Sequence, residues 1–293
     1  MKPALLYETK RGNIVEKQHF GFVIVVDNKE NIVSKIGDDE NRKFWFRSAA
    51  KPLQASLIIK SGAYEKFSLT PEELAVCCAS HAGTEKHLEK VRSVLEKIGL
   101  NESVFQCGAS EPLDIEARNL LIKNDLKPSP IHNNCSGKHV GMLASCRAKG
   151  WNTENYLDFE HPLQRKIKQA VAEFCNVDEK EIDIARDGCL APVHALPHYK
   201  MGIGHLNIFL NEDYKIIKEA FQKNPFLIGG NNRLDTEIIE ASSGKLISKV
   251  AAEGLCITVN PELKQALIVK ILDADMTARK ETVFRQLAIL KWL

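Results

Sequence analysis

The chain has 293 residues, of which 44% are hydrophobic and 27% are charged, as is ordinary for a folded globular protein. A net charge of +2 provides no basic surface of the kind that nucleic acids or anionic membranes attract. No apolar run is long enough to span a bilayer, and residues 1–11 lack the apolar core of a signal peptide. We therefore expect a cytoplasmic protein without nucleic-acid or membrane partners.

Apolar stretches predict strands at both ends of the chain and helices between them. The predicted strands are 20–26, 31–36, 245–251, 255–259 and 266–272. The predicted helices are 48–61, the run after a capping box at Thr70, 84–100, 114–123, 137–147, 162–175, 213–223 and 277–290. This order favours a mixed α+β or α/β fold whose terminal strands share one sheet. We expect one catalytic unit over residues 1–293, with a helical subdomain around 60–240.

A serine and a lysine stand three positions apart where the first long helix begins. Ser48 and Lys51 would share a face of that helix, so the lysine could remove the proton that makes the serine a poor nucleophile. Lysine acts as a base only where burial or a nearby cation lowers its pKa. Pro52 predicts an irregular first turn and biases Lys51 away from helical angles. By itself this spacing also fits an ordinary exposed helix start.

Two polar stretches and one lysine are the other candidates for chemistry. Residues 131–139 read IHNNCSGKH, in which Cys135 is a candidate metal thiolate or nucleophile and Lys138 follows three positions later. Residues 187–192 read DGCLAP and place Cys189 in a turn, a pattern that fits a buried structural turn equally well. Lys270 lies inside an apolar strand, either reaching solvent from an edge or buried with a lowered pKa.

Eight cysteines in a chain without an export signal should be mostly reduced. None of them forms a C-x-x-C pair, which argues against a zinc finger or a thioredoxin-type site. Most are best interpreted as small apolar core residues. Cys135 and Cys189 are the exceptions because of their polar surroundings.

Five segments in order give a resemblance to a known family. FRSAAKP, CASHAGTEKH, NNCSGKH, DGCLAPVHALP and a terminal VKI-D strand resemble the class 3, rhizobial-type L-asparaginases over about residues 10–285. The resemblance implies a fold similar to serine β-lactamases and glutaminases, with a central antiparallel sheet and helices packed around it. It also implies a homodimer that hydrolyses L-asparagine to L-aspartate and ammonia.

The resemblance further implies roles for individual residues. Ser48 would pair with Lys51 and Ser80 with Lys270 as the catalytic groups. A zinc ion with one bound water would be held by three ligands, Cys135, Lys138 and Cys189. Asp187 would bind the substrate's α-amino group, and Arg47 and His139 are further candidates for substrate contact or support. A lysine ligand must be neutral, so zinc binding should weaken as the pH falls.

Two details depart from the family pattern, and three other functions remain open. Asp273 is followed by Ala274 instead of glycine, and the glycine expected before Ala252 is missing, which affects local loop geometry. A β-lactamase-like acyl hydrolase would share the serine-lysine pair, but the S-D-N and K-T-G elements of that group do not occur. A glutaminase differs by one methylene of substrate, worth only about 1–3 kcal/mol of discrimination. A non-catalytic zinc or redox sensor would need only the two cysteines.

Overall fold

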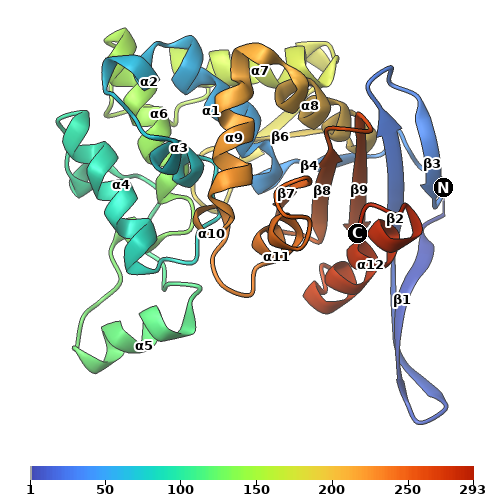
Figure 1. The fold of residues 1–293 in the computed structure, drawn as a ribbon. Coiled ribbons are helices and arrows are strands. Elements are labelled where there is room, and N and C mark those ends of the chain that lie inside the picture. The colour runs from blue at the N-terminus through green and yellow to red at the C-terminus, as the bar shows by residue number, and fades with distance from the viewer. Residues whose placement is uncertain (1) are drawn as a thin grey trace.

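The computed structural model describes residues 2–293, so that only Met1 of the expected 1–293 unit lies outside it (Figure 1). Its strands form two sheets. The strands are β1 (Ala4–Arg11), β2 (Ile14–Asp27), β3 (Ile32–Ile36), β4 (Lys43–Trp45), β5 (Asp183–Arg186), β6 (Pro192–Pro197), β7 (Ile247–Val250), β8 (Leu255–Asn260) and β9 (Gln265–Ile271). The larger sheet has the order β1-β2-β9-β8-β7, with β3 also paired to β2, and the smaller has the order β4-β6-β5.

Helices make up most of the remaining regular structure. The α-helices are α1 (Lys51–Lys60), α2 (Ala63–Lys66), α3 (Pro71–Cys77), α4 (Glu85–Lys97), α5 (Ile115–Lys123), α6 (Ser136–Lys149), α7 (Pro162–Cys175), α8 (His198–Leu210), α9 (Lys215–Lys223), α10 (Pro225–Ile228), α11 (Leu234–Ala241) and α12 (Met276–Ile289). Short 3-10 turns are η1 (Arg47–Ala50), η2 (Glu102–Val104), η3 (Pro130–His132), η4 (Glu179–Glu181) and η5 (Glu212–Tyr214). Within residues 2–293, no helix is both long and apolar enough to cross a membrane.

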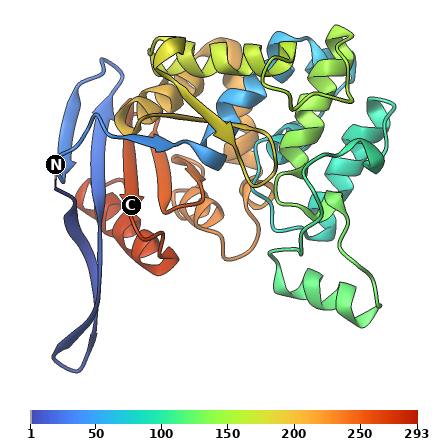
Figure 2. The same cartoon turned by 180° about the vertical axis from the view of Figure 1, so that it is seen from behind.

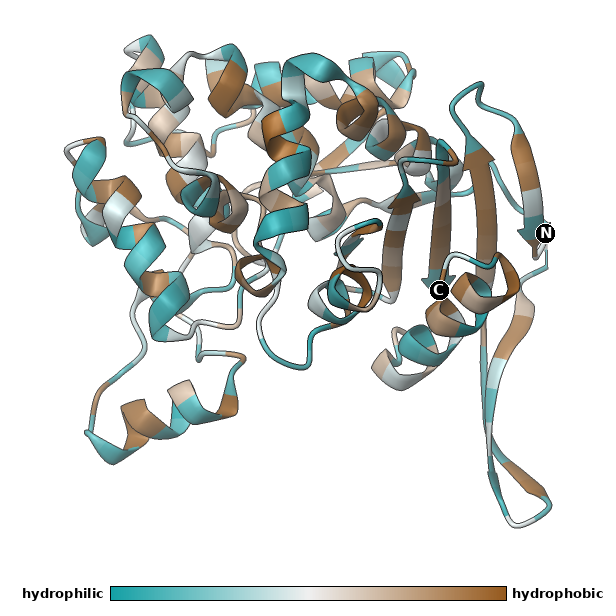
Figure 3. Cartoon of the chain, viewed as in Figure 1, coloured by the Kyte–Doolittle hydropathy of each residue, from teal (hydrophilic) through white to brown (hydrophobic). Residues whose placement is uncertain are grey.

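The larger sheet lies between two helical layers. Helix α8 packs against β2, β8 and β9, whereas α12 packs against β1, β8 and β9 from the other side. Side chains of a strand alternate between the two faces. On β9, Ala266 and Ile268 belong to the large core on the α8 side, and Leu267 and Val269 belong to the core under α12. The strands with apolar side chains on both faces are the brown ones in Figure 3. The same alternation turns Lys270 toward the α8 side.

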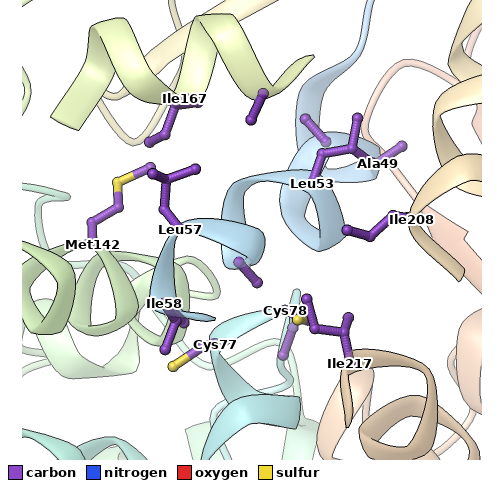
Figure 4. Close-up of a cluster of buried hydrophobic side chains, with 14 of the residues drawn as sticks. Ala49, Leu53, Leu57, Ile58, Cys77, Cys78, Met142, Ile167, Ile208 and Ile217 are labelled. Atoms are coloured by element: carbon purple, nitrogen blue, oxygen red, sulfur yellow. The ribbon is translucent and has the colours of Figure 1, made fainter. Parts of the chain in front are cut away.

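Helix α1 is the centre of the large core. Its residues from Lys51 to Ile58 are all buried, and it packs against α6, α7 and α8. Figure 4 shows Leu53 and Leu57 of this helix among side chains that come from several surrounding helices. A helix enclosed on all sides is apolar around its circumference, which is why its sequence lacks the one-sided pattern of a surface helix.

The sequence predictions agree with most of this architecture. The terminal strands share one sheet, because β2 near the N-terminus pairs with β9 near the C-terminus. The Thr70 capping box is present, and the helix predicted from residue 48 begins with the irregular turn η1. One expectation was wrong. Lys51 has helical angles of φ −58° and ψ −39°, so Pro52, in the first helical turn, does not force the preceding residue out of the helical region.

The central position of α1 predicts a large stability cost for truncating it. Leu53 is fully buried, so Leu53→Ala should lower the free energy of unfolding by about 2–5 kcal/mol, measured by urea denaturation. Leu263→Ala is the matched control, because Leu263 is exposed and its truncation should change stability by less than about 0.5 kcal/mol. Equal effects of the two substitutions would contradict this account of the core.

Candidate active site

Ser48 lies at a sharp entry into the central helix. The preceding Arg47, the first residue of η1, has φ +50°, a left-handed conformation that non-glycine residues seldom adopt. Ser48 lines a pocket of about 250 Å³. The pocket is lined by Arg47, Ser48, Ser110, Asn133, Asn134, Cys135, Asp187, Gly188, Cys189 and Ala252. Backbone strain next to a partly exposed serine is a feature of functional sites.

Lys51 is buried behind the pocket, with 1% of its surface exposed. Its Nζ donates to the Ala79 carbonyl at 2.5 Å and to Ser80 Oγ at 3.0 Å. Burial lowers the pKa of Lys51; Cys135 and Cys189 oppose this shift, whereas the charges of Lys138 and Lys249 add to it. A lysine with a lowered pKa can take up a proton from a neighbouring hydroxyl.

The four predicted catalytic residues do not form the two serine–lysine hydrogen bonds that the expected pairs imply. Lys51 is bonded to Ser80, and no hydrogen bond among residues 2–293 joins it to the Ser48 hydroxyl. Lys270 Nζ donates to the carbonyls of Glu253 and Ile271 and is not bonded to Ser80 in the described part of the chain. The arrangement therefore gives Ser48 access to the pocket and gives Ser80 the direct contact with a buried lysine.

A buried ion pair that the sequence reasoning missed lies near Lys51. Lys249 and Asp235 are both fully buried, and Lys249 Nζ donates to Asp235 Oδ2. The other carboxylate oxygen of Asp235 accepts from the backbone N–H of Val250. Lys249 lies in the apolar strand β7, and a lysine inside an apolar strand is the signal that made Lys270 a candidate. Nothing around Asp235 in the sequence indicates that it is buried.

The three predicted zinc ligands come together beside the pocket. Lys138 Nζ lies 2.9 Å from Cys189 Sγ, and Cys135, Lys138 and Cys189 are all buried. A side-chain hydrogen bond to Cys189 lowers the pKa of Cys135. Burial by itself would lower the pKa of Lys138. The neighbouring Cys189 and Cys135 sulfurs outweigh this effect, so the pKa of this lysine is raised.

Close packing of α6 on α3 holds two of these residues in place. A Cβ atom at Gly137 would lie 2.0 Å from the carbonyl oxygen of Val76, so only glycine allows this approach. Gly137 stands between Cys135 and Lys138, and Asn133 Oδ1 accepts the backbone N–H of Cys135 at 2.9 Å. The start of α6 is thereby fixed against α3, and Lys138 reaches from it to Cys189.

The donor set fits a zinc ion with an open position. Two sulfurs and, once Lys138 has lost its proton, one amine nitrogen are donors that zinc accepts, and three protein ligands leave a fourth position free. Cys135 and Cys189 also line the pocket, so that position would be near a bound substrate. Residues 2–293 contain no cluster of three or more His, Cys, Asp or Glu side chains that could hold a metal. The set described here has two such residues and depends on Lys138 as its third ligand.

The predicted substrate-binding residues differ in their access to the pocket. Arg47 Nε lies 2.9 Å from Asp187 Oδ1, and both residues line the pocket, which therefore contains a cation beside an anion. His139 is fully buried and does not line it. Its Nδ1 is hydrogen-bonded to the Tyr156 hydroxyl at 2.7 Å, and burial lowers its pKa.

Comparison with known proteins identifies the family. The family model described as L-asparaginase II matches residues 7–293. The chain belongs to the L-asparaginase II family. It is accordingly an amidohydrolase of the L-asparaginase type, and the family resemblance found in the sequence is confirmed. Among curated protein sequences no match was found.

A solved structure confirms the fold class. A β-lactamase from Mycobacterium bovis is 14% identical, with 93% of this chain and 94% of that chain covered, at a TM-score of 0.50. A β-lactamase-type protein from Bacteroides dorei is 13% identical, with 90% and 92% covered, at 0.48. Simvastatin synthase from Aspergillus terreus is 8% identical, with 90% and 91% covered, at 0.43. The first of these likenesses, together with the antiparallel sheet among helices, confirms the predicted serine β-lactamase-like fold.

The environment of Lys270 predicts a pH-dependent stability. Burial lowers the pKa of Lys270 to about 8 from its ordinary 10.5; Glu253 and Asp273 oppose this, whereas Arg42 and Arg279 add to it. Between these two values the unfolded chain binds more protons than the folded one, so stability should rise with pH. We expect the free energy of unfolding of the wild type, relative to Lys270→Met, to increase between pH 8 and 10.5 in urea titrations. A difference that stays constant over this range would contradict the lowered pKa.

Proposed function

We propose that this L-asparaginase-family protein hydrolyses L-asparagine to L-aspartate and ammonia through an acyl-enzyme. The observation that carries the proposal is the pocket in which Ser48, Arg47 and Asp187 meet in front of the buried Lys51. A volume of about 250 Å³ suits a ligand as small as one amino acid. The Arg47 cation and the Asp187 carboxylate offer partners for the carboxylate and ammonium groups of that ligand.

In the proposed mechanism, Ser48 Oγ attacks the side-chain amide carbon while neutral Lys51 accepts its proton. The C–N bond then breaks, and the proton returns to the nitrogen as ammonia leaves. Water attacks the resulting aspartyl ester, which releases aspartate and restores the Ser48 hydroxyl. The Lys51–Ser80 hydrogen bond of 3.0 Å supports Ser80 as a relay for these protons. A direct part for Lys270 stays a prediction from the family resemblance.

A zinc ion is part of the proposal, held by Cys135, Lys138 and Cys189. When bound, zinc would supply a Lewis acid beside the pocket that orients the substrate and stiffens the loops. The chain itself supports the site by fixing the start of α6 through Gly137 and Asn133.

We also propose a homodimer, following the family resemblance. A cytoplasmic location is supported by the cysteines, all of which are free and buried.

Loss of the nucleophile tests the mechanism. Ser48→Ala should lower the rate of ammonia release from asparagine by on the order of a thousand-fold or more, because no acyl-enzyme can form. Ser34→Ala, an exposed serine on β3, is the control and should keep wild-type turnover. Acid quenching and peptide mass spectrometry should find an aspartyl adduct on the peptide that contains Ser48.

Ser80→Ala separates the two serines. We expect it to slow ammonia release but to leave the adduct on Ser48. An adduct on Ser80 would reverse the assignment, and near-normal turnover by Ser48→Ala would exclude Ser48 as the nucleophile. Assays with asparagine and glutamine side by side show which amide is preferred. If neither amide releases ammonia, hydrolysis of asparagine and of glutamine is excluded.

Removal of the metal tests the zinc site. We expect about one zinc per chain in elemental analysis, in line with one three-ligand site. Cys135→Ser should lose this zinc and raise KM for asparagine more than it lowers kcat, because the ion is proposed to orient the substrate. Cys256→Ser is the matched control, since Cys256 is also buried but lies in β8 within the core under α12. Equal zinc content in all three proteins would exclude Cys135 as a ligand.

A further inference from the structure

Helix α5 lies at the surface along its full length. None of its residues, Ile115–Lys123, is buried. Figures 1 and 2 both show it standing away from the rest of the molecule at the end of two connecting segments. A helix of nine residues is marginal in water unless one of its faces packs against something else. Its stability therefore points to a contact that one chain by itself does not provide.

The surface of this region is apolar. We call residues 111–127 the α5 lobe. Its large aliphatic side chains are exposed, namely Leu113, Ile115, Leu120, Ile122 and Leu126. Figure 3 shows brown segments on this helix, far from the brown strands of the sheet. Exposed apolar patches of this kind mark interaction sites, because water would otherwise cover them at a cost in free energy.

A groove lies directly beside the exposed helix. It has a volume of about 660 Å³, and Leu88 of α4, Leu121 of α5 and Phe226 of α10 are among the residues that line it. The N-terminal side of the lobe is anchored here, since the Asp114 N–H donates to the Ala82 carbonyl at 2.9 Å. A ridge and a groove next to each other on one molecule allow two copies to fit each other reciprocally about a two-fold axis.

In the α5 lobe, most acidic residues lie toward the N-terminal end and the lysines lie at the C-terminal end. Glu111, Asp114 and Glu116 lie toward the N-terminal end, where Arg118 Nη1 lies 3.5 Å from Glu111 Oε2. The C-terminal end carries Lys123 and Lys127 with Asp125 between them. Two such lobes placed antiparallel bring the acidic end of each opposite the basic end of the other. Antiparallel helices also bring opposite dipole ends together. This charge order favours a second copy of the same chain as the partner.

We propose that the α5 lobe is the surface through which two copies of this chain pair, with their α5 helices antiparallel about a two-fold axis. The inference rests on the homodimer of the proposed function and assigns the surface that forms it. In this arrangement Glu116 of each copy lies opposite Lys123 of the other. Ile115 and Ile122 become buried between the helices.

The test places a charge in the apolar surface. Ile122 is 69% exposed, so Ile122→Glu should fold normally, which circular dichroism and thermal melting confirm. In sedimentation velocity we expect the wild type to be a dimer. For Ile122→Glu we expect the dissociation constant of the dimer to rise roughly a hundred-fold or more, because the interface would bury one glutamate from each copy. Ile289→Glu is the matched control on α12, where Ile289 is 64% exposed, and it should remain dimeric.

A charge exchange tests the antiparallel order. Glu116→Lys and Lys123→Glu should each weaken the dimer, and the double variant Glu116→Lys/Lys123→Glu should restore it. A dimer that Ile122→Glu leaves intact overturns the assigned surface but not the homodimer. A wild type that is monomeric at high micromolar concentration overturns both, and the ammonia assay still tests the proposed chemistry independently. If both single charge variants weaken the dimer and the double variant does not restore it, the antiparallel order is wrong.

Discussion

The burial of Lys51 is the constraint on which the site depends. A lysine in water holds its proton at neutral pH and is useless as a base. Here the lysine begins a helix that other helices enclose, and burial lowers its pKa, with Lys138 and Lys249 adding to this effect and Cys135 and Cys189 opposing it. The helical layer around α1 thus has a chemical role as well as a structural one. The cost of burying an amine is offset by the apolar packing of the rest of that helix.

The parts of the fold that follow local rules could be predicted from the sequence. Apolar strands at both ends, the Thr70 capping box and the amphipathic α4 were correct because their signals lie within a few residues. The candidate residues around Cys135 and Cys189 were found because glycine, cysteine and lysine are unusual together in a short loop. Zinc binding, the serine roles and the dimer stay predictions from the family resemblance.

Contacts between distant segments could not be predicted. The pairing of Lys51 with Ser80, and that of Lys249 with Asp235, depend on how α1, α3, α11 and β7 pack, and no local pattern records this. The small sheet was missed because β4 and β5 have only three and four residues and β6 begins and ends with a proline. Helix α8 was missed because a helix buried against a sheet lacks one-sided periodicity. His139 looked available in the sequence, but its neighbours enclose it.

The pairing of β2 with β9 makes this protein depend on completion of its chain. Residues 21–27 of β2 bond to residues 265–271 of β9, so that edge of an apolar strand stays open while the intervening residues are synthesised. At ribosomal rates of about 5–20 residues per second this takes roughly 12–50 seconds. An unpaired apolar edge invites association with other chains for that time. The larger sheet is therefore completed only after the C-terminal strands have been synthesised.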